Sequence, residues 1–284
     1  MDQRIINLYD SFTHGHIGRR EFIERAATIV GSTAAAMALL PLMANDYANA
    51  ATIAADDARL ASGKTSYDSP KGKIAAYVTR QKDKGKRPTV IVIHQNRGLN
   101  PHIEDIARRL ALQGYLAIAP DLLSVAGGTP ANDDQARDLH AKANKGDMLS
   151  AAIASVAFAK MHPESTGKVG AVGFCYGGGV VNAMAVASAD LAAGVAYYGQ
   201  QPPAEKVTSI QAALVLHYAG LDERINAGIP AYEAALKKDG KRYAIYIYPN
   251  VNHAFNDDTT NRYDKAAADL AWSRTLACFK ENLG

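Results

Sequence analysis

The sequence has little cysteine and no long uninterrupted apolar run. Its two cysteines, Cys175 and Cys278, are too few for the disulfide framework of a small secreted domain. Cys278 lies in a helical pattern, and we interpret it as a small core residue. The most apolar stretch, Ala26 to Ala44, contains glycine, serine, threonine and proline and is rich in alanine. A stable membrane span is therefore not expected.

A strong charge of one sign is also missing. The net charge of +3 comes from 31 basic and 28 acidic residues spread along the chain. Without a dense basic stripe, nucleic acid is not an expected partner. Because 48% of the residues are apolar and 21% are charged, the chain should fold. Its 284 residues suit one domain with an N-terminal appendage.

The first 50 residues have the order of parts found in an export signal. A paired arginine, Arg19-Arg20, precedes the modest apolar stretch, and Ala48-Asn49-Ala50 follows as a small-x-small cleavage site. This order resembles bacterial twin-arginine signals and predicts a periplasmic or secreted protein. The alternative is an uncleaved amphipathic helix, Arg20 to Leu42, that packs on the domain or on a partner chain of a cytoplasmic protein. Residues 51–63 are small and polar, as in a linker.

From residue 64 to residue 284, short β-branched runs alternate with longer stretches of helical apolar spacing. This alternation predicts one α/β domain with a mainly parallel sheet and helices on both faces. The predicted strands are 74–78, 89–94, 115–119, 168–174, 192–197, 213–218 and 243–248. The predicted helices are 102–113, 147–160, 178–188, 229–238 and 264–282. Ligands of such sheets bind at the carboxyl ends of the strands.

One of these carboxyl ends carries a nucleophile motif. An apolar strand runs into Gly173-Phe174-Cys175-Tyr176-Gly177, which opens a helix of small residues. Glycines two residues before and after the nucleophile allow a tight strand-to-helix turn that exposes the side chain. The positive end of the helix favours a thiolate, so Cys175 is predicted to be reactive. Alone, the motif could also be an ordinary glycine turn with a buried cysteine.

Two further residues follow later strands in the order of a catalytic triad. Asp222 ends Gly220-Leu221-Asp222, and His253 follows the next strand in Asn252-His253-Ala254-Phe255. Nucleophile, acid and histidine in this order fit a triad in which His253 is the base and Asp222 orients it. The expected oxyanion donors are the backbone N–H groups of Tyr176 and Asn96. Asp222 could instead be only a helix cap.

Several motifs together resemble the dienelactone hydrolase family of α/β-hydrolases. They are His94-Gln95-Asn96-Arg97-Gly98-Leu99-Asn100-Pro101, Pro120-Asp121, Gly173 to Gly178, Gly220 to Asp222 and Asn252 to Phe255. The resemblance covers about residues 64 to 284. It implies an α/β-hydrolase fold and hydrolysis of a small carboxylic ester or lactone through a thioester, with no cofactor and no metal.

The chain departs from the family pattern at the glutamate that is thought to take the thiol proton, because Gln95 stands there. Gln95 could orient the thiol or the substrate by hydrogen bonds. The arginines that hold a substrate carboxylate in the family are replaced by Val125 and Asp257. The remaining candidates for the substrate pocket are Gln95, Arg97, Tyr198 and Arg224.

The replaced glutamate leaves a second function open, a ligand-binding member of the fold with weak or no turnover. Thiol redox chemistry is a third, weaker interpretation, because no resolving cysteine is evident near Cys175. No metal site is expected, since His14 and His16 lie in the signal-like segment and the domain has no histidine–cysteine cluster. The oligomeric state does not follow from the sequence.

Overall fold

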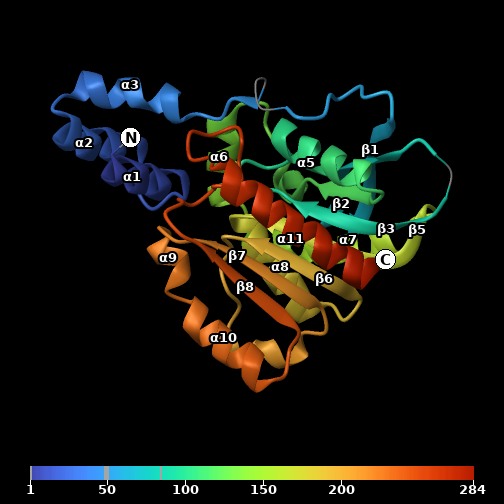
Figure 1. Cartoon of the computed structure of the whole chain (residues 1–284). Helices are drawn as coiled ribbons and strands as arrows, with labels where there is room; N and C mark the ends of the chain where they lie inside the picture. The colour runs from blue at the N-terminus through green and yellow to red at the C-terminus, as the bar shows by residue number, and fades with distance from the viewer. Residues whose placement is uncertain (1, 48–50, 84) are drawn as a thin grey trace.

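A twisted eight-stranded sheet forms the centre of the protein in a computed structural model, which describes residues 2–47, 51–83 and 85–284 (Figure 1). The strand order is β1-β2-β4-β3-β5-β6-β7-β8. Strands β3 to β8 pair in parallel, while β1 pairs with β2 and β2 pairs with β4 in antiparallel register. The bounds are β1 Leu60–Ser69, β2 Gly72–Gln81, β3 Arg87–Ile93, β4 Leu116–Pro120, β5 Ser165–Phe174, β6 Leu191–Tyr197, β7 Ala213–Ala219 and β8 Tyr243–Tyr248.

Helices cover both faces of this sheet, as the alternating pattern predicts. One core cluster joins α5 and α11 to one face, and a second joins α7, α8 and α10 to the other. The helices of the domain are α5 Pro101–Leu112, α6 Asp133–Lys142, α7 Lys145–Met161, α8 Tyr176–Ala187, α9 Glu223–Asn226, α10 Ile229–Lys238 and α11 Lys265–Leu283. The short 3₁₀ helices are η1 Leu122–Ala126 and η2 Ala204–Ser209. This is the α/β-hydrolase architecture.

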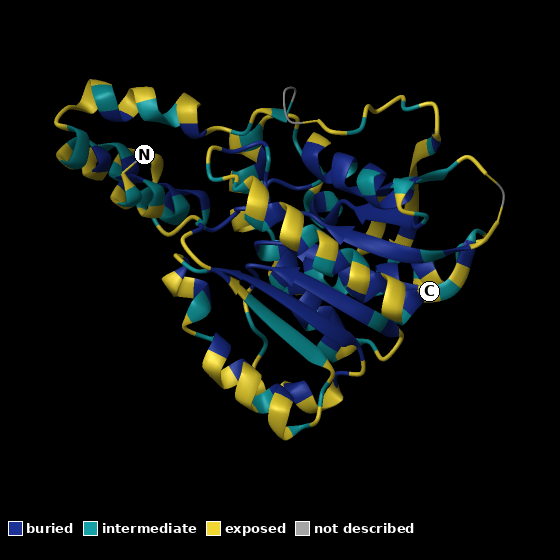
Figure 2. Ribbon diagram, viewed as in Figure 1, coloured by how far each residue is buried: buried dark blue, intermediate teal, exposed yellow. Residues whose placement is uncertain are grey.

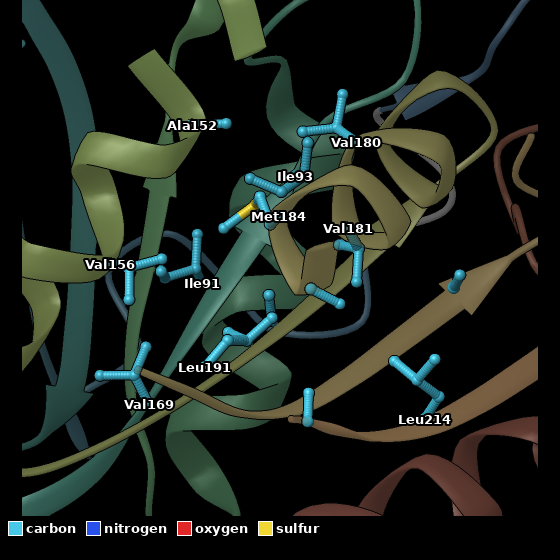
Figure 3. Close-up of a cluster of buried hydrophobic side chains, with 14 of the residues drawn as sticks. Ile91, Ile93, Ala152, Val156, Val169, Val180, Val181, Met184, Leu191 and Leu214 are labelled. Carbon is cyan, nitrogen blue, oxygen red and sulfur yellow. The ribbon is translucent and has the colours of Figure 1, made fainter. Parts of the chain in front are cut away.

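The central strands β3 to β7 are mostly apolar because both faces are covered. Figure 2 shows them as buried, with the exposed residues on the outer sides of the helices. Figure 3 shows Met184 and Val181 of α8 facing Ile91 of β3 and Leu191 of β6. Burial of such side chains contributes roughly 1.5–3 kcal/mol each relative to exposure. This packing holds α8 firmly behind the turn at Cys175.

Strand β1 begins at Leu60, inside the stretch that the sequence predicts to be a linker. Only Leu60 and Tyr67 of this strand are buried. An edge strand with nearly all its side chains in water lacks the apolar alternation that predicts a strand. The predicted start of the domain at residue 64 is therefore a few residues late.

The N-terminal segment, which we define as residues 2–47, forms three helices. They are α1 Gln3–Thr13, α2 Arg19–Val30 and α3 Thr33–Met43, and they enclose a small core of their own around Phe12 and Phe22. In Figure 1 they lie beside the part of the domain that carries α6 and α9. The single helix that the sequence allows over 20–42 is broken at Gly31, whose φ of 87° needs glycine. The Ala48-Asn49-Ala50 cleavage site lies outside the described residues.

We find no single helix in the described ranges with the length and hydropathy to cross a membrane. Helices α2 and α3 have the required length and hydropathy only when taken together, and the two helices are bent by 113° to each other.

Candidate active site

Cys175 occupies a strained turn between β5 and α8. Its φ of 57° and ψ of −117° are rare for a residue with a side chain. A Cβ at Gly173 would lie 2.1 Å from the carbonyl oxygen of Gly177, and one at Gly177 would lie 2.4 Å from that of Ile93. Both positions therefore require glycine, as the motif predicts. The turn places the thiol at the N-terminus of α8.

Asp222 and His253 meet after the neighbouring strands β7 and β8. The Nδ1 atom of His253 lies 2.5 Å from Oδ2 of Asp222, and both side chains are buried. Since the carboxylate accepts, Nδ1 carries the proton and Nε2 of the neutral ring is an acceptor. This Nε2 atom is buried and has no hydrogen-bond partner among the residues that the structure describes. It is free to take or give a proton.

The thiol itself contacts a residue of the N-terminal segment. Nε2 of His14 lies 3.0 Å from Sγ of Cys175, and the rings of His14 and His253 meet edge to face with centroids 5.0 Å apart. Nothing in the sequence predicts His14 here, because it stands in the signal-like segment, 161 residues before Cys175 (175 − 14). No local sequence pattern predicts a contact between two residues so far apart in the chain.

The charges around the thiol favour its ionised form. Burial alone would raise the pKa of Cys175, but the neighbouring His14 and His253 lower it well below its usual value. Burial alone would lower the pKa of His253, but Asp10 and Cys175 raise it to about 10, helped by the hydrogen bond to Asp222. These directions favour a thiolate at Cys175 and an imidazolium at His253.

A pocket of about 830 Å³ opens between the domain and the N-terminal segment at this point. The predicted residues that line it are Cys175, His253, Tyr176, Asn96, Tyr198 and Arg224. Its opposite wall comes from residues 12–19 of the N-terminal segment. Asp222 lies behind His253, where an orienting acid belongs.

Gln95 and Arg97 do not line this pocket. Nε2 of Gln95 donates to Oδ2 of the buried Asp257 at 3.0 Å, so its amide helps to hold a carboxylate. Arg97 is buried beside Asp133 at 3.5 Å and lines a separate cavity against the N-terminal segment. As positioned here, neither side chain contacts the thiol.

The other two pocket candidates do lie at the site. The ring of Tyr198 packs on that of His253 with centroids 4.7 Å apart, and its φ is 38°. Its buried hydroxyl has no hydrogen-bond partner among the described residues. Arg224 lies at the rim, 3.5 Å from Asp10.

Polar contacts hold the N-terminal segment over the site. The side chain of Asn96 donates to the carbonyl of Thr13 at 2.5 Å, and Gln3 donates to Asn252, the neighbour of His253, at 2.5 Å. Asp10 lies 3.5 Å from Arg224 and 3.5 Å from Arg262. Asp10 is therefore the charged centre of this contact.

The charge of Asp10 should stabilise the contact between segment and domain. Burial raises the pKa of its carboxyl, but His253, His14, Arg262 and Arg224 together lower it to about 2. A lowered carboxyl pKa stabilises the folded form above the ordinary value of 3.8 and loses this effect as the pH falls towards 2. The shift corresponds to about 2 kcal/mol at neutral pH.

We therefore expect Asp10→Asn to loosen the N-terminal segment. Trypsin should cleave the Asp10→Asn variant after Arg19 and Arg20 roughly 30-fold faster than the wild type. A loss of about 2 kcal/mol raises the population with a detached segment by this factor. Asp269→Asn removes an exposed carboxylate that pairs with Lys265 on α11, outside the N-terminal segment, and is the matched control. Equal cleavage of Asp10→Asn and wild type would show that the charge does not hold the segment.

Two groups of side chains bring together atoms that metal ions use. His102, Asp257 and Asp258 form one, but Arg109 already pairs with Asp258 at 2.6 Å and supplies the positive charge. His14, Cys175 and His253 form the other. A tetrahedral zinc would hold nitrogen and sulfur about 3.5 Å apart, whereas Nε2 of His14 and Sγ are at 3.0 Å. That distance fits a hydrogen bond better than a shared ion.

Comparisons with known proteins agree with this fold. Residues 74–283 match the family model of the dienelactone hydrolase family, and residues 1–31 match a separate model described as YqhI-like. A protein of Escherichia coli O157:H7 named "Putative carboxymethylenebutenolidase" is 33% identical, over 80% of this chain and 89% of its own length. A protein of Methylorubrum extorquens with the same name is 31% identical, over 88% of this chain and 89% of its own.

A crystal structure of a "Putative Dienelactone Hydrolase" from Klebsiella pneumoniae has a TM-score of 0.71 and 28% identity. The match covers 78% of this chain and 99% of that one. Family model, relatives and structure all point to hydrolysis of carboxylic esters or lactones. The chain belongs to the dienelactone hydrolase family.

Proposed function

We propose that this hydrolase cleaves a small carboxylic ester or lactone with Cys175 as nucleophile, His253 as proton carrier and Asp222 as orienting acid. The observation that supports this most directly is the position of Cys175. Cys175 lines a pocket, lies on a strained turn, and shares the pocket with His253, which is hydrogen-bonded to Asp222. Strain of this kind is retained where surrounding packing enforces it, as α8 and its core do here.

The reaction follows from these positions. The thiolate of Cys175 attacks the acyl carbon, and the tetrahedral intermediate collapses when protonated His253 gives its Nε2 proton to the leaving alkoxide. This yields a thioester on Cys175 and a neutral His253. His253 then removes a proton from water, the hydroxide attacks the thioester, and the acid is released with return of the thiolate.

The oxyanion of each tetrahedral intermediate needs hydrogen-bond donors. The N–H of Tyr176 begins α8 and so has no partner inside the helix. Asn96, which follows β3, lines the same pocket as Cys175 and Tyr176. We assign the backbone N–H groups of these two residues to the oxyanion, each donor contributing on the order of 10²-fold or more to the rate.

The pocket suits a small acyl group with some polarity. Tyr198 and Tyr176 present aromatic faces beside the thiol, and Arg224 stands at the rim. Arg224 forms an ion pair with Asp10, so a substrate carboxylate would have to compete with Asp10 for the guanidinium. We therefore favour neutral esters and lactones. No described contact favours ligand capture without turnover.

The test is mass spectrometry of the protein after mixing with p-nitrophenyl acetate. We expect an acetyl group on the peptide of Cys175 that forms before steady state and disappears when substrate is consumed. Cys278→Ala is the matched control, because the pKa of this second, buried thiol is raised to about 11 and it should not be acylated. Turnover without any adduct on Cys175 would contradict the thioester route.

A further inference from the structure

We propose that His14 is a further catalytic residue, which accepts the proton of the Cys175 thiol while His253 serves the leaving group and the water. The N-terminal segment is then part of the active site. The proposal rests on the proposed function, because it assigns the first proton transfer of that reaction. It explains how the enzyme can activate its cysteine with Gln95 in place of a carboxylate.

The hydrogen bonds at the thiol carry the proposal. Nε2 of His14 lies 3.0 Å from Sγ, within hydrogen-bond distance. Nε2 of His253 is buried and has no hydrogen bond of good geometry to any residue that the structure describes. The side chain that could replace a family glutamate, Gln95, is instead bound to Asp257. The sulfur of Cys175 is therefore linked to His14, and Nε2 of His253 stays available.

A hydrogen bond holds the ring of His14 in the tautomer that this role requires. Its Nδ1 atom lies 2.7 Å from the carbonyl oxygen of Asp10, which can only accept, so Nδ1 carries the proton. Nε2 then has a lone pair directed at the thiol. The charged groups around the ring are the carboxylate of Asp10 at 3.4 Å and His253, with His16 stacked 6.2 Å away.

The position of the ring is fixed from both sides. His14 follows the last residue of α1, and the carbonyl of its neighbour Thr13 accepts the short hydrogen bond from the side chain of Asn96. Asn96 itself follows β3, on the rim of the pocket. The hydrogen bond from Asn96 of the domain thus holds the loop that carries His14 in place, as a preformed catalytic contact requires.

The chemical step is a simple proton transfer. The S–H bond of Cys175 breaks, its proton moves to Nε2 of His14, and the thiolate keeps the electron pair for attack on the acyl carbon. The proton returns to the thiolate, or leaves to solvent through the open pocket, after the acid product departs. No other reactant is needed.

The experiment compares wild type with His14→Ala in two reactions. Alkylation of Cys175 by iodoacetamide at neutral pH requires only the thiolate, whereas acylation by p-nitrophenyl acetate also requires the rest of the machinery. We expect His14→Ala to lower the alkylation rate about tenfold and the acylation rate about 100-fold, the lower range for a general base. Added imidazole should restore both rates in proportion to its neutral form, because the pocket opens to solvent.

Two controls separate chemistry from structure. His162→Gln removes an imidazole just before the start of β5, at the other end of the strand that Cys175 follows, and should leave both rates within twofold. Thermal unfolding and trypsin cleavage after Arg19 show whether His14→Ala keeps its fold and its docked segment. If either is lost, His14→Gln replaces it in the alkylation assay, because Gln can keep the contact but cannot take the proton.

The outcomes are distinct. Unchanged alkylation in a folded His14 variant overturns the proposal, and so does a loss that imidazole does not restore. If no ester acylates the wild type, the proposed function fails. In that case the alkylation rates of wild type and His14→Ala still show whether His14 ionises the thiol.

Discussion

Cys175→Ala should lower the kcat for hydrolysis of an activated ester by roughly 10⁵- to 10⁶-fold relative to the wild type. The reason is that every later step acts on a covalent bond to Sγ. Hydrogen-bond donors such as the N–H groups of Tyr176 and Asn96 would remain and could retain a small residual rate. The measurement is the steady-state hydrolysis of p-nitrophenyl acetate.

The fold of this variant should be intact, because alanine at 175 keeps the same backbone strain and removes one atom at a pocket wall. Cys278→Ala removes the other thiol, on α11, and should keep wild-type kcat. Activity of Cys175→Ala within a hundredfold of wild type would rule out the thiol as nucleophile. The geometry would then point to a water activated by His253.

His253→Ala should lower kcat by about 10³-fold or more, and Asp222→Asn by up to about 10⁴-fold. His253 is the group placed to protonate the leaving alkoxide and to activate water, since its Nε2 is unpaired at the pocket. Asn at 222 keeps the shape but can present an N–H to Nδ1, which would favour the wrong tautomer of the ring. The readout is single-turnover acylation and deacylation, measured separately.

Both phases should slow in these variants, and deacylation should slow more because only His253 is assigned to the attacking water. Glu223→Gln, one residue from Asp222 and exposed, is the matched control and should not change either phase. Deacylation at the wild-type rate in His253→Ala would remove His253 from the second half of the reaction. His14 would then be the remaining imidazole beside the thioester.

Much of the domain follows from short-range patterns. The apolar runs of β3 to β8 and the glycines around Cys175 are local signals, because buried parallel strands and a nucleophile turn restrict residue type position by position. The contact between Asp222 and His253 is longer in range, but the rule that ligands meet at the carboxyl ends of parallel strands is enough to predict it. The strand β1 is missed because its side chains face water and leave no apolar pattern.

The N-terminal segment is where sequence reasoning is weakest. A paired arginine followed by an alanine-rich apolar stretch is equally compatible with an export signal and with helices that pack on the domain. The structure shows the packed helices, whereas export stays a prediction that packing does not test. Arg97 and Gln95 show the same limit on a smaller scale, since Arg97 pairs with Asp133 and Gln95 with the buried Asp257 instead of facing the pocket.

By itself, the sequence determined the α/β fold, the turn at Cys175 and the order of nucleophile, acid and histidine. Each of these depends on backbone conformation and burial, and both restrict which residue types can stand at neighbouring positions of the sequence. Only the tertiary structure decided that His14 reaches the thiol, that Asp10 meets two arginines of the domain and that Gln95 turns to Asp257. Those contacts join side chains more than 150 residues apart (162 for Gln95 and Asp257), and pairings at such separations depend on how whole elements pack rather than on any local pattern.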